Sequence, residues 1–501
     1  MNLIVSNLPA ILSIFPFLVF IIILLKGKTS LLKASVITLA IFTIFAIFYW
    51  KILPTLLLIS FGKGFFVAFD IFIIILGAIF FLSLLEKIGV IKNISYYLEH
   101  FSLDYRLQII LLAWLFEAFI EGTAGFGTPV AIVAPLLVGI GLSPIRALVI
   151  ALLGNSAAVV FGAVGTPIRV GFAGLNTTTV PLISAIINCS GFIIPVFMLW
   201  IITKGRVNRK KEFLSGLPFA IWAGIAFVIP SVFAVALGQE FPTIIGSIIG
   251  VILILITTKF GLFVPKEQIS LNDRVKLRSS MSATQAFLPY GILILFLILG
   301  KIFLGNKGID IPFGFTHSFN LFNPGFAFIL ASIVVALIWK SKKEIVIPLM
   351  SKSFTGAINP FLVIVSTSVL VQLMINSGQN HSGFPAAITL IAKVFETSFL
   401  PFFTPFIGAF GSFITGSATV SNIMFGNFFN TASIFLGYNV SLILSLAVVG
   451  ASAGNMIALS DMLAAQAVLG VKNQERQILK GVFIPCVSFL IIVGIIGMFL
   501  S

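Results

Sequence analysis

The residues best suited to chemistry lie in one stretch, Glu117–Pro129, which reads Glu-Ala-Phe-Ile-Glu-Gly-Thr-Ala-Gly-Phe-Gly-Thr-Pro. Two carboxyl groups, three glycines and two threonines interrupt a region that is otherwise apolar. Glu117 and Glu121 are spaced i, i+4, so a helix places them on one face. Charge inside a membrane is costly and usually marks an ion or proton pathway. We therefore predict that Glu121 carries a proton, the alternative being a structural acid that caps the turn or pairs with a base.

A second polar stretch resembles the first. Phe119-Ile120-x-Gly122-Thr123-Ala124 and Phe413-Ile414-x-Gly416-Ser417-Ala418 match at the same spacing. The apolar runs beside the first stretch, 107–119 and 128–142, are each shorter than the ~20 residues of a spanning helix. Irregular backbone inside a membrane is tolerated where protein buries it or where it lines a wet cavity. The pattern predicts two re-entrant hairpins, at 107–142 and 397–436, with polar tips.

The composition indicates an all-α polytopic membrane protein. The chain has 501 residues, of which 59% are hydrophobic and 9% charged, and its mean hydropathy is +1.19, values typical of membrane bundles. The net charge of +15 comes from short loops, which favours a topological role over nucleic-acid binding. Cys189 and Cys486 lie in apolar segments and suggest neither a disulfide framework nor a metal site. We expect no cofactor, and we find no nucleophile–base pair typical of an enzyme.

The apolar segments form two similar series. In each, a hairpin follows a predicted surface segment (90–106 and 384–396) and precedes a span broken by glycine and asparagine. Broken spans commonly carry the midplane site of transporters, and two series with opposite insertion form inverted repeats. We predict about 12 spans in one transporter domain, divided into repeat 1 (about 1–212), two linking spans (213–258), a cytoplasmic loop (259–285) and repeat 2 (about 286–501).

The basic loops set the predicted orientation. Lys26, Lys28 and Lys33 lie between the first two spans, and cytoplasmic loops collect positive charge. The loops at 340–352 and 472–480 are also basic and fall on the same side by this count. Both chain termini are therefore expected on the outer side of the cytoplasmic membrane.

Several polar residues begin predicted helices inside the membrane. Thr128-Pro129, Thr166-Pro167 and the cluster at 417–421 would present free N–H groups and a positive dipole end, which suit a carboxylate. The alternative is that small residues only pack helices tightly in lipid. The predicted substrate-binding residues are Gly122, Thr123, Gly125, Gly127, Thr128, Asn155, Ser156, Thr166, Ser417, Thr419, Ser421, Asn422 and Asn455.

Other charged residues lie within or beside the predicted membrane segments. Glu117 and Asp461 join Glu121 as proton-coupling candidates, whereas Asp70 is expected to be structural. Arg169 lies just past the Gly165-Thr166-Pro167 break. There its guanidinium group either binds a carboxylate bidentately or lies at the outer surface.

The stretch Phe119–Pro129 resembles the tip of the bacterial L-lactate permease family, Phe-Ile-Glu-Gly-x-x-Gly-Phe-Gly-Thr-Pro. The resemblance continues at Ala134–Val138, at Asn155-Ser156 and at Phe161–Ile168, which reads Phe-Gly-Ala-Val-Gly-Thr-Pro-Ile. It implies proton-coupled transport of lactate and related 2-hydroxy monocarboxylates such as glycolate.

The second half departs from that family. Ala418 stands where the family tip has an acid, and Asn455 stands where it has a lysine. Joint loss of a pair leaves no uncompensated buried charge, which is the costly outcome. Arg169 and Asp461 would then form a relocated pair. We interpret the chain as a proton-coupled symporter of small monocarboxylates; a sodium-coupled carrier or a passive anion channel are the alternatives.

Overall fold

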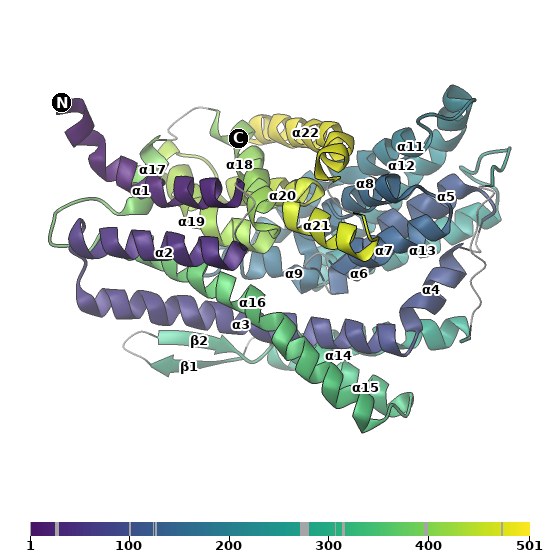
Figure 1. Cartoon of the computed structure of the whole chain (residues 1–501), viewed down its shortest axis with the longest axis horizontal. Coiled ribbons are helices and arrows are strands. Elements are labelled where there is room, and N and C mark those ends of the chain that lie inside the picture. The colour runs from purple at the N-terminus through teal and green to yellow at the C-terminus, as the bar shows by residue number, and fades with distance from the viewer. Residues whose placement is uncertain are drawn as a thin grey trace.

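The computed structural model describes residues 2–25, 30–99, 102–123, 125, 128–270, 280–305, 307–312, 316–394, 399–471 and 474–501. Within these residues the chain is almost entirely helical (Figure 1). The lysines predicted to orient the first loop, Lys26 and Lys28, lie outside the described residues.

The first series of helices ends near residue 202. It comprises α1 (Asn2–Leu25), α2 (Leu31–Phe48), α3 (Pro54–Lys87), α4 (Val90–Glu99), α5 (Tyr105–Ile110), the π-helix η1 (Leu111–Phe116), α6 (Glu117–Thr123), α7 (Thr128–Gly139), α8 (Pro144–Gly154), η2 (Ala157–Phe161), α9 (Gly162–Arg169), α10 (Val180–Asn188), η3 (Cys189–Ile193) and α11 (Ile194–Ile202). The first predicted hairpin is therefore α5–η1–α6 followed by α7, and the first broken span is α8–η2–α9.

Two linking helices lead to the second series. They are α12 (Arg209–Ala234), continued by η4 (Val235–Leu237), and α13 (Pro242–Lys259). The second series comprises α14 (Ala283–Leu304), α15 (Pro324–Ile338), α16 (Lys343–Asn376), α17 (Ala387–Val394), α18 (Leu400–Thr415), α19 (Ala418–Leu436), α20 (Val440–Gly454), η5 (Asn455–Ile457), α21 (Leu459–Val468) and α22 (Glu475–Leu500). Here α18 and α19 form the second hairpin and α20–η5–α21 the second broken span.

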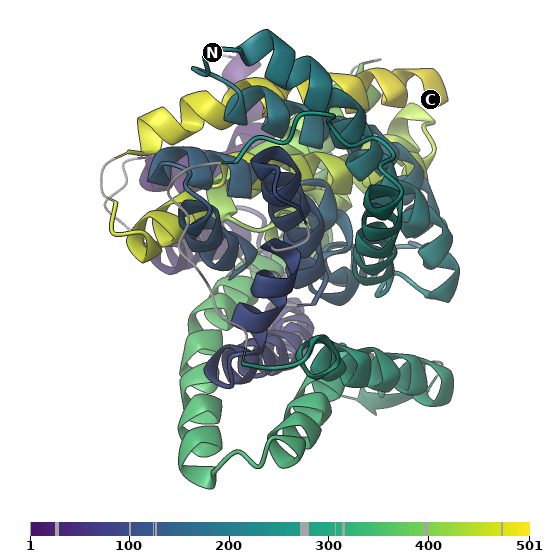
Figure 2. The ribbon, with the colours of Figure 1, turned by 90° about the vertical axis from the view of Figure 1, so that its right-hand side faces the viewer.

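The helices form two groups. Long helices α3 and α16 pack along each other, and α2, α14 and α15 join them. The green and teal segments of this group extend away from the rest of the bundle in Figure 2. The other group holds both hairpins and both broken spans, with α12, α13 and α22 around them. The two groups meet where α16 contacts α19 and α3 contacts α9, so the hairpins lie inside the molecule.

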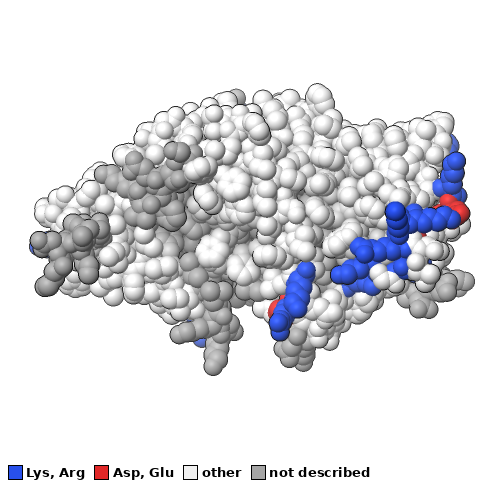
Figure 3. All heavy atoms as spheres, turned by 90° about the horizontal axis from the view of Figure 1, so that it is seen from above, with Lys and Arg blue, Asp and Glu red and all other residues white. Residues whose placement is uncertain are grey.

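The apolar surface agrees with a membrane protein. Among the described residues, nine helices are long and apolar enough to span a bilayer, and a tenth if the pair Pro144–Gly154 and Ala157–Arg169, bent by 43°, counts as one span. Four shorter apolar helices include Pro324–Ile338 and Leu400–Thr415. On the face drawn in Figure 3 most described residues are uncharged, and Lys and Arg gather from the middle of the lower edge to the right-hand end. The twelve spans and the inversion of the two repeats stay predictions.

Two sequence interpretations need correction. Residues 90–106 do not form one surface helix: α4 ends at Glu99, and Asp104 caps the next helix with its carboxylate accepting from the Arg106 N–H at 2.9 Å. Asp104 and Arg106 are fully buried, because α12 covers them. The antiparallel strands β1 (Gly308–Pro312) and β2 (Thr316–Asn320) depart from the all-α prediction.

Candidate functional site

The first tip carries both acids into the interior. A π-helical segment, η1, precedes Glu117, and such local widenings of a helix are frequent at functional sites. Glu117 and Glu121 are 0% and 3% exposed, and they lie close enough to repel each other when both are charged. Neither oxygen of Glu117 has a hydrogen-bond partner, nor has one oxygen of Glu121. The acids are thus buried without the partners that a purely structural acid requires.

The first broken span contains a left-handed turn. Ala163, Val164 and Gly165 all have positive φ, of 42°, 58° and 76°. A β-branched residue such as Val164 is a genuine outlier in this region, and strain of this kind clusters at functional sites. The turn ends the helix and lets a new one begin at Thr166-Pro167, as the sequence predicted. Gly165 also packs so closely on the carbonyl of Gln239 that a side chain would collide with it.

The second tip is a tight turn between α18 and α19. Gly416 ends α18 in the left-handed conformation, with φ 70°. Ser417 caps α19, its hydroxyl accepting from the Val420 N–H at 3.3 Å. The predicted helix start at Ser417 is therefore correct, and the positive end of the 19-residue helix α19 faces the interior.

The tips and the broken spans meet at one small cavity. It is lined by Glu121, Val159, Gly162, Ala163, Thr166, Pro167, Gly416, Ser417, Ala418, Thr419 and Asn455. The two halves of the chain touch directly here: the Thr419 hydroxyl donates to that of Thr166 at 3.4 Å, and the Asn422 amide to the Pro167 carbonyl at 2.9 Å. The volume of about 20 Å³ has room for about one water molecule. We call it the central cavity.

Five of the predicted site residues line the central cavity: Glu121, Thr166, Ser417, Thr419 and Asn455. Gly125 lies beside it, because a side chain there would come within 3.3 Å of a Glu121 oxygen. Sequence reasoning missed Val159, Gly162 and Ala163 as wall residues, and it named Gly416 only as part of the tip motif. The break at Gly165-Thr166-Pro167 was the available signal for the first three.

The other predicted residues have different surroundings. Gly122 packs on Ile244 of α13. The Thr123 and Ser156 hydroxyls donate to backbone carbonyls about one turn earlier in the chain. The Ser421 hydroxyl donates to the Gly408 carbonyl at 2.8 Å, within the second hairpin. Asn155 is fully buried, and its amide atoms have no hydrogen-bond partner. Gly127 lies outside the described residues, and only the backbone of Thr128 is described.

Glycine at position 162 makes room for the Glu121 carboxylate. An added Cβ would collide with Glu121 Oε1, although the backbone itself, with φ −62° and ψ 159°, suits any residue. We expect Gly162→Ala to displace the carboxylate and to reduce transport strongly while the protein still folds. Gly291→Ala is the matched control, since nothing lies within 4 Å of its Cβ. Uptake per amount of membrane protein measures both, and equal uptake by the two variants would contradict this role of Gly162.

Arg169 belongs to a different cluster from the one predicted. Its Nη1 lies 3.8 Å from Glu240 Oε1, and its Nη2 donates to the Phe322 carbonyl at 2.6 Å. Lys301 of α14 reaches the same carboxylate at 3.2 Å. Glu240 is 1% exposed, and it was not among the residues predicted from the sequence. The predicted pair of Arg169 with Asp461 is therefore wrong, because the loop after η4 supplies a nearer acid.

The corrected pairing changes the expected outcome of charge reversal. Arg169→Glu leaves Glu240 beside a second acid, which is unfavourable in a buried site. We expect Glu240→Arg to restore part of the transport lost in Arg169→Glu, and Asp461→Arg to restore none. Uptake by the two double variants measures this. Rescue by Asp461→Arg alone would contradict the pairing.

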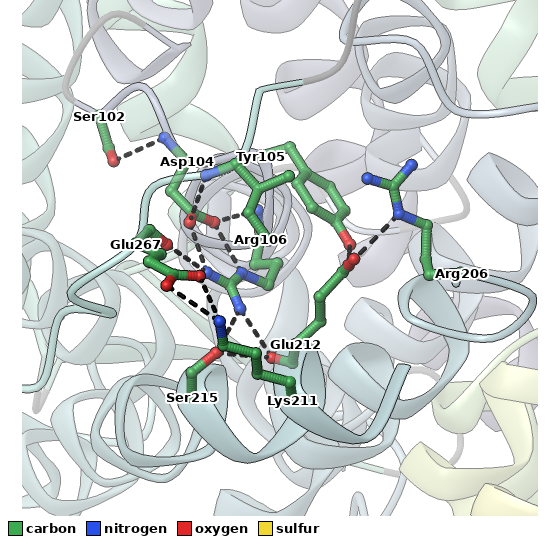
Figure 4. A network of polar contacts seen from close by, with 10 residues as sticks. Ser102, Asp104, Tyr105, Arg106, Arg206, Lys211, Glu212, Ser215 and Glu267 are labelled. Atoms are coloured by element: carbon green, nitrogen blue, oxygen red, sulfur yellow. Dashed lines mark hydrogen bonds and ion pairs between the residues drawn. The ribbon is translucent and has the colours of Figure 1, made fainter. Parts of the chain in front are cut away.

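The start of the first hairpin is fixed by a polar network (Figure 4). Arg106 pairs with Asp104 at 2.6 Å and donates to the carbonyls of Glu212 and Glu267 at 2.7 and 3.1 Å. The Tyr105 hydroxyl donates to the Glu212 carboxylate at 2.9 Å. At the rim, the Lys211 ammonium lowers the pKa of the exposed Glu267 carboxyl. The network ties the hairpin to α12 and to the segment after α13.

A bundle of apolar helices with two hairpins that meet at a small polar cavity defines a multi-pass membrane transporter. Comparison with known protein families narrows this class to one family. A model described as L-lactate permease matches residues 9–307 and 306–501, so the chain belongs to the L-lactate permease family. Permeases are transporters rather than enzymes.

Individual relatives agree with this assignment. A putative L-lactate permease of Haemophilus influenzae is 29% identical, with 85% of this chain and 86% of the relative covered. The L-lactate permease and the glycolate permease GlcA of Escherichia coli K12 are each 26% identical, with 98% and 95% covered. Among solved structures, Neisseria gonorrhoeae MtrF, from work on a class of antimetabolite efflux pumps, overlaps with a TM-score of 0.45 and 16% identity, covering 98% of this chain and 94% of MtrF.

Proposed function

We propose that the protein is a secondary active transporter that moves L-lactate or a related small 2-hydroxy monocarboxylate together with protons. The names of the relatives support the substrate class. The observation that carries proton coupling is the position of Glu121 in the wall of the central cavity. Among the described residues of that wall, Glu121 has a titratable carboxyl group and none is lysine or arginine.

The electrostatics of the cavity favour symport. A substrate carboxylate would bind at the start of α19, where the N–H groups of Ala418 and Thr419 at the first turn of the helix and the Ser417 hydroxyl proton are available. A helix end supplies only about half a positive charge. An ionised Glu121 in the same low-dielectric cavity would repel the substrate carboxylate more strongly than the helix end attracts it. Protonation of Glu121 removes the repulsion, so that substrate and proton bind together.

Substrate binding requires the walls to separate. A cavity with room for about one water, of about 20 Å³, does not hold a monocarboxylate. We propose that the two tips move apart to admit substrate and close around it. Each tip would be exposed to one side of the membrane in turn, which is the behaviour of carriers with a midplane site.

The two alternatives are a sodium-coupled carrier and a passive anion channel. Unpaired acceptors at Glu121 Oε2 and Asn455 Oδ1 also suit Na⁺, which prefers oxygen ligands. A passive anion channel would need a continuous open path, whereas the central cavity, at about 20 Å³, has room for about one water molecule. We propose a location in the bacterial cytoplasmic membrane with both termini outside, small monocarboxylate and H⁺ as partners, and contact with lipid but not nucleic acid.

The test is uptake of labelled L-lactate by cells that lack their own permeases. We expect accumulation above the medium concentration, abolished by a protonophore and unchanged when sodium is replaced. Dependence on sodium would instead indicate that Na⁺, bound by oxygen ligands, is the coupling ion. Equilibration without accumulation would indicate a channel. Cells that contain the protein in the membrane but take up no lactate would contradict lactate as substrate.

A further inference from the structure

A second, larger cavity adjoins the central cavity. It measures about 500 Å³ and is lined by Ser30, Leu31, Leu32, Ala131, Asn359, Pro360, Val363, Ile364, Thr415, Gly416, Ser417, Val420, Asp461 and Ala464. Gly416 and Ser417 line both cavities. The turn of the second hairpin is thus a wall that the two cavities share. We call the larger cavity the vestibule.

A polar side chain on α16 indicates that the vestibule holds water. Asn359 is exposed near the middle of this apolar 34-residue helix. Its side chain is part of the vestibule lining. An exposed amide in hydrocarbon is unfavourable unless it is hydrogen-bonded. Water in the vestibule provides hydrogen-bond partners for this amide, and lipid does not.

Acidic groups line the cavities in series. Glu121 belongs to the central cavity and Asp461 to the vestibule, and the two carboxylates lie within electrostatic range of each other. Asp461 is 5% exposed. A proton that leaves Glu121 toward the vestibule would therefore meet a second carboxyl group, that of Asp461.

The surroundings of the vestibule place it on the cytoplasmic side. Three of the helices that line it, α2, α16 and α21, each adjoin a basic loop: residues 26–33 precede α2, residues 340–352 include the start of α16, and residues 472–480 follow α21. All three loops are predicted to be cytoplasmic by their charge.

We propose that the vestibule is the cytoplasmic half of the transport path, and that the Gly416–Ser417 turn is the barrier between it and the central cavity. The inference rests on the proposed function, since it takes the central cavity as the substrate site. Its occupant is the small monocarboxylate, released into water when the turn moves. A lipid acyl chain is the competing occupant, because most of the lining is apolar.

Cysteine accessibility tests the proposal. The native thiols are first removed by Cys189→Ser and Cys486→Ala. Asn359→Cys and Ala464→Cys then place single thiols at exposed positions in the vestibule lining. Leu362→Cys and Leu463→Cys are matched controls on the same two helices, because both side chains are exposed, at 38% and 54%, but do not line the vestibule. A charged, membrane-impermeant thiol reagent is applied to inside-out and right-side-out vesicles.

We expect both vestibule thiols to react in inside-out vesicles and the controls to stay unmodified, with loss of lactate transport on modification. Reaction only in right-side-out vesicles, or no reaction at all, would overturn the proposal, the second result being that expected of a lipid-filled cavity. Modification without loss of transport would also overturn it. Failure of the unmodified cysteine-free protein to transport lactate would count against the proposed function instead, while the labelling pattern still decides whether the vestibule is wet and opens inward.

Discussion

Replacement of Arg106 by methionine is expected to lower the free energy of unfolding by about 3–5 kcal/mol, the usual cost of breaking a buried ion pair from one side. Arg106 is fully buried and makes five hydrogen bonds, which join Asp104 to α12 and to the segment after α13. Methionine keeps the length of the apolar stem but leaves the buried Asp104 carboxylate without its positively charged partner and the carbonyls of Glu212 and Glu267 without their donor. Chemical denaturation of the purified protein in detergent measures the change.

The neighbouring ion pair of Lys211 with Glu267 is the control. It is nearly as short as the buried pair, at 2.8 Å against 2.6 Å, but its side chains are 67% and 71% exposed. Exposed pairs contribute little because water screens them and their side chains lose entropy. We therefore expect Lys211→Met to leave the unfolding curve almost unchanged. Equal loss of stability in the two variants would show that burial does not decide the strength of this network.

Replacement of Glu121 by glutamine is expected to abolish accumulation of substrate against a gradient. Glutamine has nearly the same shape as a protonated glutamic acid but cannot exchange a proton. The variant should still bind the monocarboxylate, since no charge repels it in the central cavity. We expect it to exchange labelled for unlabelled lactate across the membrane while net proton-driven uptake falls to background. Counterflow and protonophore-sensitive uptake, measured in the same vesicles, separate the two activities.

Glu117→Gln provides the comparison for this result. Glu117 lies one turn before Glu121 and is equally buried, but it does not line the central cavity. We expect it to reduce uptake less than Glu121→Gln does. If Glu121→Gln still accumulated lactate and Glu117→Gln did not, the coupling proton would have to be assigned to Glu117.

The sequence by itself determined the membrane class, the two hairpins and the two broken spans. Each follows from local properties: the length of an apolar run, a glycine that permits a left-handed turn at Gly416, and a Thr-Pro pair that starts a helix at Thr166. It also identified Glu121, because a carboxyl group within an apolar run is costly wherever the chain folds.

Only the tertiary structure decided which polar side chains face the central cavity. Neighbouring helices fix the rotation of each tip, so that Gly122 packs on α13 and Ser421 bonds within its hairpin, while Thr419 reaches Thr166. The partner of Arg169 depended in the same way on Glu240, which follows a separate helix. Asp104 and Arg106 resemble surface residues in the sequence because their burial comes entirely from α12 and the segment after α13. Pairing between distant segments leaves no local pattern, and for that reason the contacts that assemble this site could not be derived from the sequence.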